Sequence, residues 1–213
     1  MRDGLLSPRM KALIFDLDGT LVDSSPLHAA AFRAVLAEYR PDLLAEFSYR
    51  DIAGLSTQHA LSQIGVAASE LMALAGAKQA HYRASLAGLK AMPGARSLLE
   101  LLRIRGADIA IVSSASRASA LQALAVTQLA PLAAALITAD DVLSAKPAPD
   151  PYLAALRLLD AKPSQAIAIE DAPVGIASAR AAGLRVIGMH DDSLRGLSDW
   201  YFPDFAALAE ALA

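Results

Sequence analysis

The chain has 213 residues, enough for one large domain or for a domain with an insert. Hydrophobic residues make up 55% and charged residues 19% of the chain, with a formal net charge of -3, so we expect a globular protein without a broad attraction to nucleic acid or anionic lipid. The absence of cysteine excludes disulfides, thiolate nucleophiles and cysteine-ligated zinc sites. The polar N-terminal residues do not resemble a signal peptide and no apolar run approaches the length of a membrane span, so we expect a cytoplasmic protein without membrane contact.

The first predicted strand, residues 11–15, leads directly into two aspartates, Asp16 and Asp18. Side chains two residues apart on an extended strand point the same way, so both carboxylates can enter one small space. Like charges at that distance repel unless a cation neutralises them, and Gly19 allows a sharp turn just afterwards. The segment suits a divalent metal beside an attacking carboxylate, although an acidic turn after a strand is the plainer alternative.

The pattern changes between about residues 24 and 90. Apolar residues recur there at helical spacing, and no convincing strand interrupts them. We therefore expect a small helical bundle inserted after the first strand, with its exit near Pro93.

The remainder of the chain alternates apolar runs with helical patterns. Four runs have the length of buried strands: 108–112, 134–138, 166–169 and 184–188. Three stretches have helical spacing: 94–105, 150–160 and 173–182. Strands that alternate with helices in this way require right-handed crossovers and a parallel sheet covered on both faces. The sequence thus predicts a doubly wound, Rossmann-like α/β core.

Polar side chains follow four of the predicted strands, at the edge where parallel sheets bind ligands. They are the two aspartates after the first strand, Ser113 and Ser114 after the second, Lys146 beyond the third, and Glu170 and Asp171 after the fourth. Taken singly, turn serines, a solvated lysine and acids at a helix N-terminus are ordinary features. Their joint position is harder to dismiss, because it brings carboxylates, hydroxyls and an ammonium to one edge.

These elements resemble the haloacid-dehalogenase superfamily of phosphohydrolases over nearly the whole chain. The resemblance rests on Asp-x-Asp-Gly-Thr-Leu-Val-Asp-Ser at residues 16–24, the serine pair, Lys146-Pro147 and Glu170-Asp171-Ala172-Pro173, which occur in the right order. The insert resembles the cap of the subgroup that contains phosphoglycolate phosphatases, sugar-phosphate phosphatases and β-phosphoglucomutases. The resemblance implies a core of residues 9–23 and 91–213 with a helical cap of residues 24–90.

The resemblance also implies catalytic roles. Asp16 would attack phosphorus and form an aspartyl-phosphate, and Asp18 would act first as general acid and then as general base. Mg²⁺ would bind an Asp16 oxygen, the Asp18 backbone carbonyl and Asp171, with Glu170 as a further ligand or just outside the ligand set.

Phosphate contacts follow from the same resemblance. Ser114 and Lys146 would hold the phosphoryl oxygens, assisted by the backbone N–H groups of Leu17, Asp18 and Ala115. Ser113 competes with Ser114 for this role, because the sequence leaves open which member of the pair faces the phosphate.

Residues of the predicted cap and the loop before it are candidates for substrate contact. Thr20, Ser24 and His28 follow the first aspartate pair, and His28 shares a helix face with Ser24. In the resembling mutases a histidine at this position orients the acid/base aspartate, whereas a packing histidine is the alternative. Gly54 and Thr57 lie in a segment that resembles a substrate-facing cap loop. The mutases carry arginine where Thr57 stands, which favours a substrate with a single phosphate.

The sequence thus predicts a Mg²⁺-dependent phosphatase that acts on a small sugar, polyol or glycolate phosphate. A β-phosphoglucomutase is the first alternative. A phospho-accepting receiver module of two-component signalling is a remote one, disfavoured by the length, by the insert and by Asp18, since an acid/base group beside the acceptor hastens phosphate loss. We expect no nucleic-acid partner and, by default, a monomer.

Overall fold

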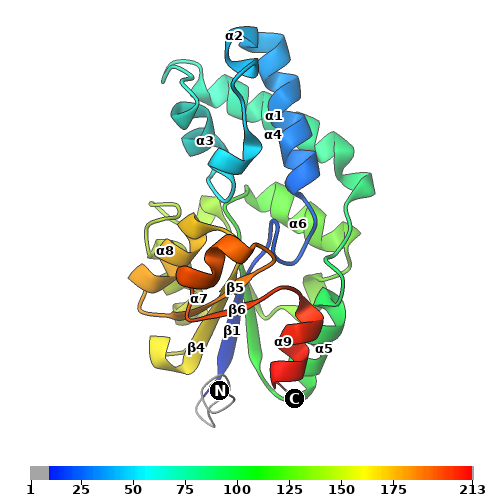
Figure 1. Cartoon of the computed structure of the whole chain (residues 1–213), viewed down its shortest axis with the longest axis vertical. Helices are drawn as coiled ribbons and strands as arrows, with labels where there is room; N and C mark the ends of the chain where they lie inside the picture. Colours follow the sequence, from blue (N-terminus) through cyan, green and yellow to red (C-terminus); the bar gives the residue numbers. More distant parts are fainter. Residues whose placement is uncertain (1–9, 213) are drawn as a thin grey trace.

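The computed structural model describes residues 10–212, which form an α/β core beneath a helical unit (Figure 1). The core contains a six-stranded parallel sheet in the order β3-β2-β1-β4-β5-β6. Its strands are β1 (Ala12–Asp16), β2 (Asp108–Val112), β3 (Ala135–Ile137), β4 (Ala166–Glu170), β5 (Arg185–Met189) and β6 (Trp200–Phe202). The predicted α/β fold is confirmed, while the N-terminal residues and Arg9, the predicted start of the core, lie outside the described residues.

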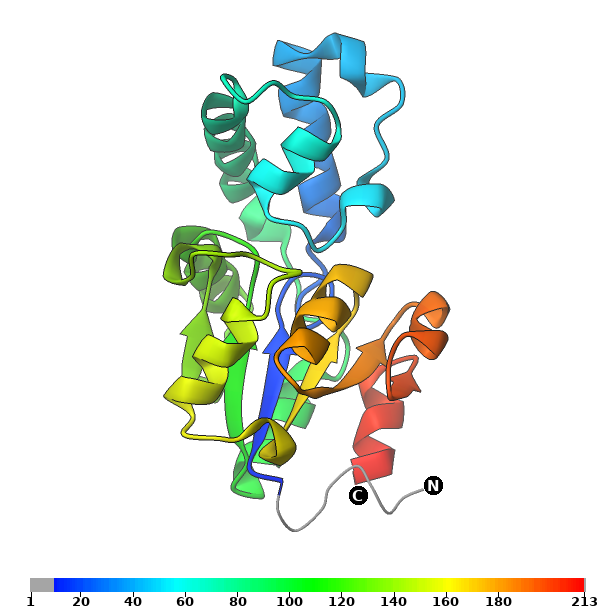
Figure 2. The same cartoon turned by 90° about the vertical axis from the view of Figure 1, so that its left-hand side faces the viewer.

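Helices cover both faces of the sheet, which explains why its strands are apolar on both sides. Leu13 and Phe15 of β1 pack with α5 (Ala95–Ile104), α6 (Arg117–Val126) and α9 (Phe205–Leu212) on one face. Ala12 and Ile14 point to the other face and pack with α7 (Asp150–Leu158) and α8 (Pro173–Ala181), as Figure 2 shows for the helices. Short 3-10 turns complete the core: η3 (Ala130–Leu132), η4 (Ala139–Asp141), η5 (Pro163–Gln165) and η6 (Asp192–Gly196).

The five predicted strands are all present, each within about one residue of its predicted bounds. The sequence analysis missed β6, an edge strand of 3 residues whose side chains are only half-buried. It also named neither α6 nor α9. A strand this short gives too little alternation to be distinguished from a loop.

The helical unit between β1 and α5 has an apolar core of its own. It comprises α1 (Ser25–Tyr39), α2 (Pro41–Leu44), η1 (Tyr49–Ile52), α3 (Thr57–Gln63), α4 (Leu71–Ser85) and η2 (Leu86–Gly88). Its buried cluster includes Phe32, Val35, Leu36, Leu61 and Leu74, and α1 packs along α4. Two chain segments connect this unit to the core, and they run side by side. A hydrogen bond joins them, in which the Asp23 N–H donates to the Lys90 carbonyl at 2.9 Å. Both views place this unit over the carboxyl ends of the strands (Figures 1 and 2).

Within residues 10–212, no helix combines the length and the hydrophobicity that are needed to cross a membrane.

Candidate active site

Four side chains from three strand ends meet at the carboxyl edge of the sheet. Lys146, in the loop beyond β3, places Nζ 2.5 Å from Asp16 Oδ1 and 2.7 Å from Glu170 Oε1. Ligand atoms of Asp16, Glu170 and Asp171 all lie within 4.8 Å of one another. The structure therefore brings together these four residues, which the sequence places up to 155 positions apart (171 minus 16).

The same cluster has the donor set and the charge of a divalent metal site. Asp16 Oδ2 is buried and has no hydrogen-bond partner among the described residues, so its lone pairs are available to a cation. Gly19 has φ +92, and a Cβ there would lie 2.1 Å from Asp171 Oδ2, so the loop can approach this carboxylate only as glycine. Three carboxylates against one ammonium leave an excess of negative charge. Hard oxygen ligands of this kind fit Mg²⁺.

The ionisation of these carboxylates reflects that excess of charge. Burial raises the pKa of Asp16; the Lys146 ammonium opposes the rise, and the neighbouring carboxylates reinforce it. Burial, followed by the charge of Glu170, raises the pKa of Asp171 to about 7, although Thr20 Oγ1 donates a 2.8 Å hydrogen bond to it. Protons or a cation must therefore compensate the cluster near neutral pH.

This linkage predicts a pH-dependent effect of Mg²⁺ on stability. A carboxyl whose folded pKa is raised to about 7 stabilises the metal-free protein below its unfolded pKa, and that contribution is lost as the pH rises through 7. Mg²⁺ binds the ionised form, so excess Mg²⁺ should raise the melting temperature by about 5 °C at pH 8 and by much less at pH 5. Thermal unfolding with Mg²⁺ or with EDTA at each pH measures this. Asp171→Asn should abolish the difference, and an equal Mg²⁺ effect at both pH values would contradict the prediction.

Asp18 faces a different environment from Asp16. Its Oδ1 lies 3.1 Å from His28 Nε2 and accepts from the Tyr82 hydroxyl at 3.4 Å, while Ser113 Oγ donates to Oδ2 at 3.0 Å. Burial alone would raise the pKa of Asp18, but the hydrogen bonds from His28 and Ser113 outweigh it and hold that pKa well below its ordinary range. The pKa values of the two aspartates are thus shifted in opposite directions, that of Asp16 upward by burial and that of Asp18 downward by its hydrogen-bond partners.

A buried lysine fixes the tautomer of His28. Lys78 Nζ lies 2.7 Å from His28 Nδ1, and an ammonium can only donate, so Nδ1 accepts and Nε2–H donates to Asp18. Burial, followed by the charge of Lys78, lowers the pKa of His28, and burial lowers the pKa of Lys78 to about 8. The sequence analysis missed Lys78 and Tyr82, although both fall on the buried stripe of α4 at four-residue steps from Leu74.

A small cavity of about 40 Å³ lies where the helical unit meets the strand ends. Seven of the predicted residues line it: Asp16, Asp18, His28, Gly54, Thr57, Ser114 and Ala115. Ser114 Oγ faces the cavity region and donates to the Gly54 carbonyl at 2.9 Å, whereas Ser113 is buried against Asp18. The cavity thus combines both aspartates with residues of the helical unit.

Two residues predicted to contact substrate are placed elsewhere. Thr20 is buried and its hydroxyl donates a hydrogen bond to Asp171, while Ser24 Oγ is buried without a hydrogen-bond partner among the described residues. Neither lines the small cavity. A direct contact of either residue with substrate remains a prediction that this geometry does not favour.

Comparison with known proteins identifies the family. The family model for the haloacid dehalogenase-like hydrolases matches residues 13–189. The chain belongs to this family. Protein CbbY of Rhodobacter capsulatus is 32% identical over 94% of this chain and 96% of that protein, and hexitol phosphatase A of Escherichia coli is 33% identical over 85% and 84%. The crystal structure of a Pseudomonas syringae hydrolase superposes with a TM-score of 0.86 at 26% identity, covering 95% of this chain and 98% of that one.

The site of this haloacid dehalogenase-like hydrolase includes a buried tyrosine that the sequence analysis missed. The Tyr152 hydroxyl donates to Glu170 Oε1 at 2.5 Å, the same oxygen that accepts from Lys146. Gly175 lets Glu170 lie close to α8, since a Cβ there would stand 1.9 Å from Oε1. Tyr152 gave no signal in the sequence because its ring also fits the apolar stripe of α7.

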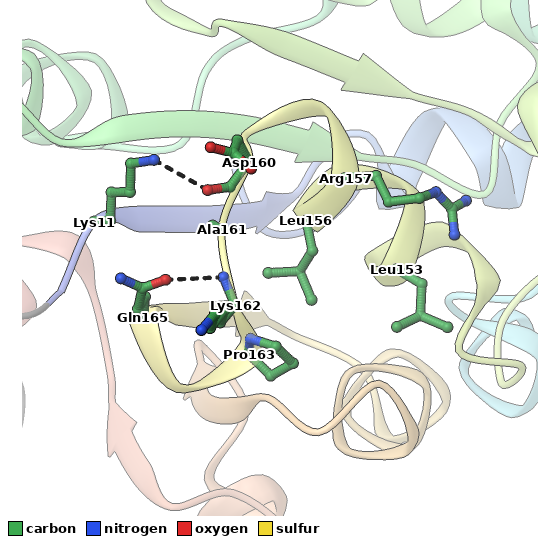
Figure 3. A pocket seen from close by; sticks show the side chains of 9 residues that line it. All are labelled: Lys11, Leu153, Leu156, Arg157, Asp160, Ala161, Lys162, Pro163 and Gln165. Atoms are coloured by element: carbon green, nitrogen blue, oxygen red, sulfur yellow. Dashed lines mark hydrogen bonds between the residues drawn. The ribbon is translucent and has the colours of Figure 1, made fainter.

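A larger cavity of about 720 Å³ lies at the opposite end of the core (Figure 3). Lys11, just before β1, reaches the Asp160 carbonyl there at 3.0 Å, and Lys162 N–H donates to Gln165 Oε1 at 3.1 Å. None of the predicted site residues lines it. Size alone therefore does not locate the active site of this family member.

Proposed function

We propose that this phosphoric monoester hydrolase removes phosphate from a small phosphorylated metabolite, such as a sugar, polyol or glycolate phosphate, through an aspartyl-phosphate on Asp16. One observation carries the proposal: Lys146 holds one oxygen of Asp16, the other has no hydrogen-bond partner among the described residues, and Asp18 is held in a separate hydrogen-bond network. A nucleophile and an acid/base group need such different environments. The phosphatase names of several relatives support the same conclusion.

The reaction has two steps on these residues. An Asp16 oxygen attacks phosphorus, the bond from phosphorus to the leaving oxygen breaks, and Asp18 gives its proton to that oxygen. Water then attacks the aspartyl-phosphate, Asp18 takes the water proton, and phosphate leaves. Asp18 starts out ionised in the substrate-free protein, and the negative charge of an entering phosphate raises its pKa so that it can carry the proton.

Phosphate and metal would each contact Asp16. Ser114, the Ala115 N–H and Lys146 would hold the phosphoryl oxygens, of which Ser114 is supported by its place in the cavity lining. Asp16, Asp171 and the Asp18 backbone carbonyl would bind Mg²⁺, with Glu170 beside them. When bound, this ion screens the carboxylate nucleophile from the negative phosphate.

Residues 24–90 would act as the cap that excludes water during turnover. This unit supplies polar partners of Asp18 and of His28: His28 on α1 and Tyr82 on α4 hydrogen-bond to Asp18, and Lys78 on α4 hydrogen-bonds to His28. Movement of the cap would therefore release the acid/base aspartate from the groups that hold it. The cytoplasmic location, the monomeric state and the absence of nucleic-acid partners remain predictions.

A panel of phosphorylated metabolites assayed with Mg²⁺ tests the proposal. We expect release of inorganic phosphate from at least one small monoester and loss of this activity in EDTA. A glucose monophosphate with a bisphosphate primer separates the mutase alternative, which would return the phosphoryl group to sugar instead of to water. No hydrolysis of any monoester, in metal-replete assay of the folded protein, would overturn the proposal.

A further inference from the structure

Two cavities meet at the boundary between the cap and the core. The inner one, about 40 Å³ beside Asp16 and Asp18, has room for about one water molecule. The outer one, about 430 Å³, is within the size range of small-molecule sites. Thr57, Gln79 and Ser114 line both, so they form a partition between the two. A substrate with its phosphate at Asp16 would place its leaving group toward the outer cavity, across these three residues.

Hydrogen bonds hold the partition across the cap and the core. Gln79 Nε2 donates to Thr57 Oγ1 at 2.9 Å, and Gln79 Oε1 accepts from Ser119 Oγ of the core helix α6 at 2.9 Å. Ser114 Oγ donates to the carbonyl of Gly54 in the cap loop. Each of these groups is an uncharged donor or acceptor that a substrate hydroxyl could replace.

The polar lining of the outer cavity is almost entirely uncharged. Its hydroxyl and amide side chains are Ser56, Thr57, Gln58, Gln79, Ser114 and Ser116. Its ionisable side chains are His59 and Asp140, and no lysine or arginine is present among the described residues that line it. The lysine of the inner cavity, Lys78, is held by His28 and lies over the rings of Phe32 and Tyr82.

This distribution of charge discriminates between leaving groups. A second phosphate or a carboxylate in the outer cavity would meet the negative charge of Asp140 and no lysine or arginine of the described lining, so its desolvation would not be compensated. A chain or ring of hydroxyl groups would instead find donors and acceptors on the partition and beyond it.

We infer that the outer cavity is the leaving-group site and that it selects neutral, polyhydroxylated leaving groups, that is, monophosphates of sugars or polyols rather than phosphoglycolate, pyrophosphate or sugar bisphosphates. This inference rests on the proposed phosphatase function and narrows its substrate class.

Substrate selectivity of the wild-type protein is the first test. In the presence of Mg²⁺, we compare kcat/KM for a hexose or hexitol monophosphate with kcat/KM for two other substrates, phosphoglycolate and the bisphosphate of the same hexose. The value for the monophosphate should be higher than each of the other two by about tenfold or more. A preference for phosphoglycolate or for the bisphosphate would overturn the inference while leaving the phosphatase function intact. Failure of every monoester to react would overturn both.

A charge placed in the outer cavity is the second test. Gln58 is exposed on the cavity lining, so Gln58→Lys adds a cation there without altering the partition. It should raise the ratio of kcat/KM for the bisphosphate to that for the monophosphate by about fivefold, and added salt should reduce this gain. Gln122→Lys makes the same change on an exposed position of α6 that lines neither cavity, and it should leave the ratio unchanged. Equal ratios in the two variants would contradict the inference.

Discussion

Asp16→Asn should abolish phosphate release, lowering kcat by about ten-thousand-fold or more, while the protein remains folded. The amide cannot form the acyl phosphate, and no other described carboxylate has both the free buried oxygen and the contact with Lys146 that Asp16 has. Stability should change little, because the neutral amide escapes the burial cost that raises the pKa of Asp16, and Lys146 keeps Glu170 as a partner. Phosphate release and thermal unfolding of the same preparation measure both effects.

A matched control is available at the other end of the core. Asp160→Asn makes the same chemical change at a position with φ 46, a backbone conformation that asparagine tolerates, and far from the strand-end carboxylates. It should retain wild-type activity. Turnover by Asp16→Asn near the wild-type rate would show that Asp16 is not the nucleophile.

The core residues that sequence reasoning located share one property: their place follows from the predicted strands, whereas His28, Gly54 and Thr57 of the helical unit were found only through the family resemblance. Buried parallel strands are strongly apolar, and their carboxyl ends lie at one edge, so Asp16, Lys146, Glu170 and Asp171 could be grouped before any coordinates were known. The family resemblance then supplied chemical roles that spacing alone does not. This is why the centre of the site was predicted better than its periphery.

The residues that sequence reasoning missed depend on packing between distant helices. Lys78 reaches His28 from another cap helix, and Gln79 joins the cap to Ser119 of the core. Tyr152 reaches Glu170 across the face of the sheet. Each lies in a helix whose sequence explains it equally well as an ordinary surface or core residue, so only the tertiary arrangement reveals its polar partner. The partition between the cavities arises from the same kind of contact.

Lys146→Met should both inactivate and destabilise the protein. The side chain is 2% exposed and its ammonium faces two carboxylates, so its loss leaves buried negative charge without a partner. Removal of one member of such a buried group costs about 3–5 kcal/mol of unfolding free energy. In the proposed mechanism Lys146 also holds the transferring phosphoryl group, so its loss should lower kcat by about 100-fold or more. Urea unfolding and phosphate release measure the two losses. Lys162→Met, at an exposed position of the opposite end of the core, should cause neither.

The pH dependence separates lost charge compensation from lost packing in Lys146→Met. Lys146 opposes the rise in the pKa of Asp16, so the variant raises that pKa further. A raised folded pKa contributes stability at low pH that is lost as the pH rises. The loss of unfolding free energy in the variant, relative to wild type, should therefore be largest above neutrality and should shrink as the pH falls toward about 4. Adding Glu170→Gln removes one of the uncompensated charges and should restore part of the loss at neutral pH. The loss of unfolding free energy could instead be the same at every pH and unchanged in the double variant. That result would mean that Lys146 stabilises the core by packing, because a lost packing contact does not depend on the ionisation of its neighbours.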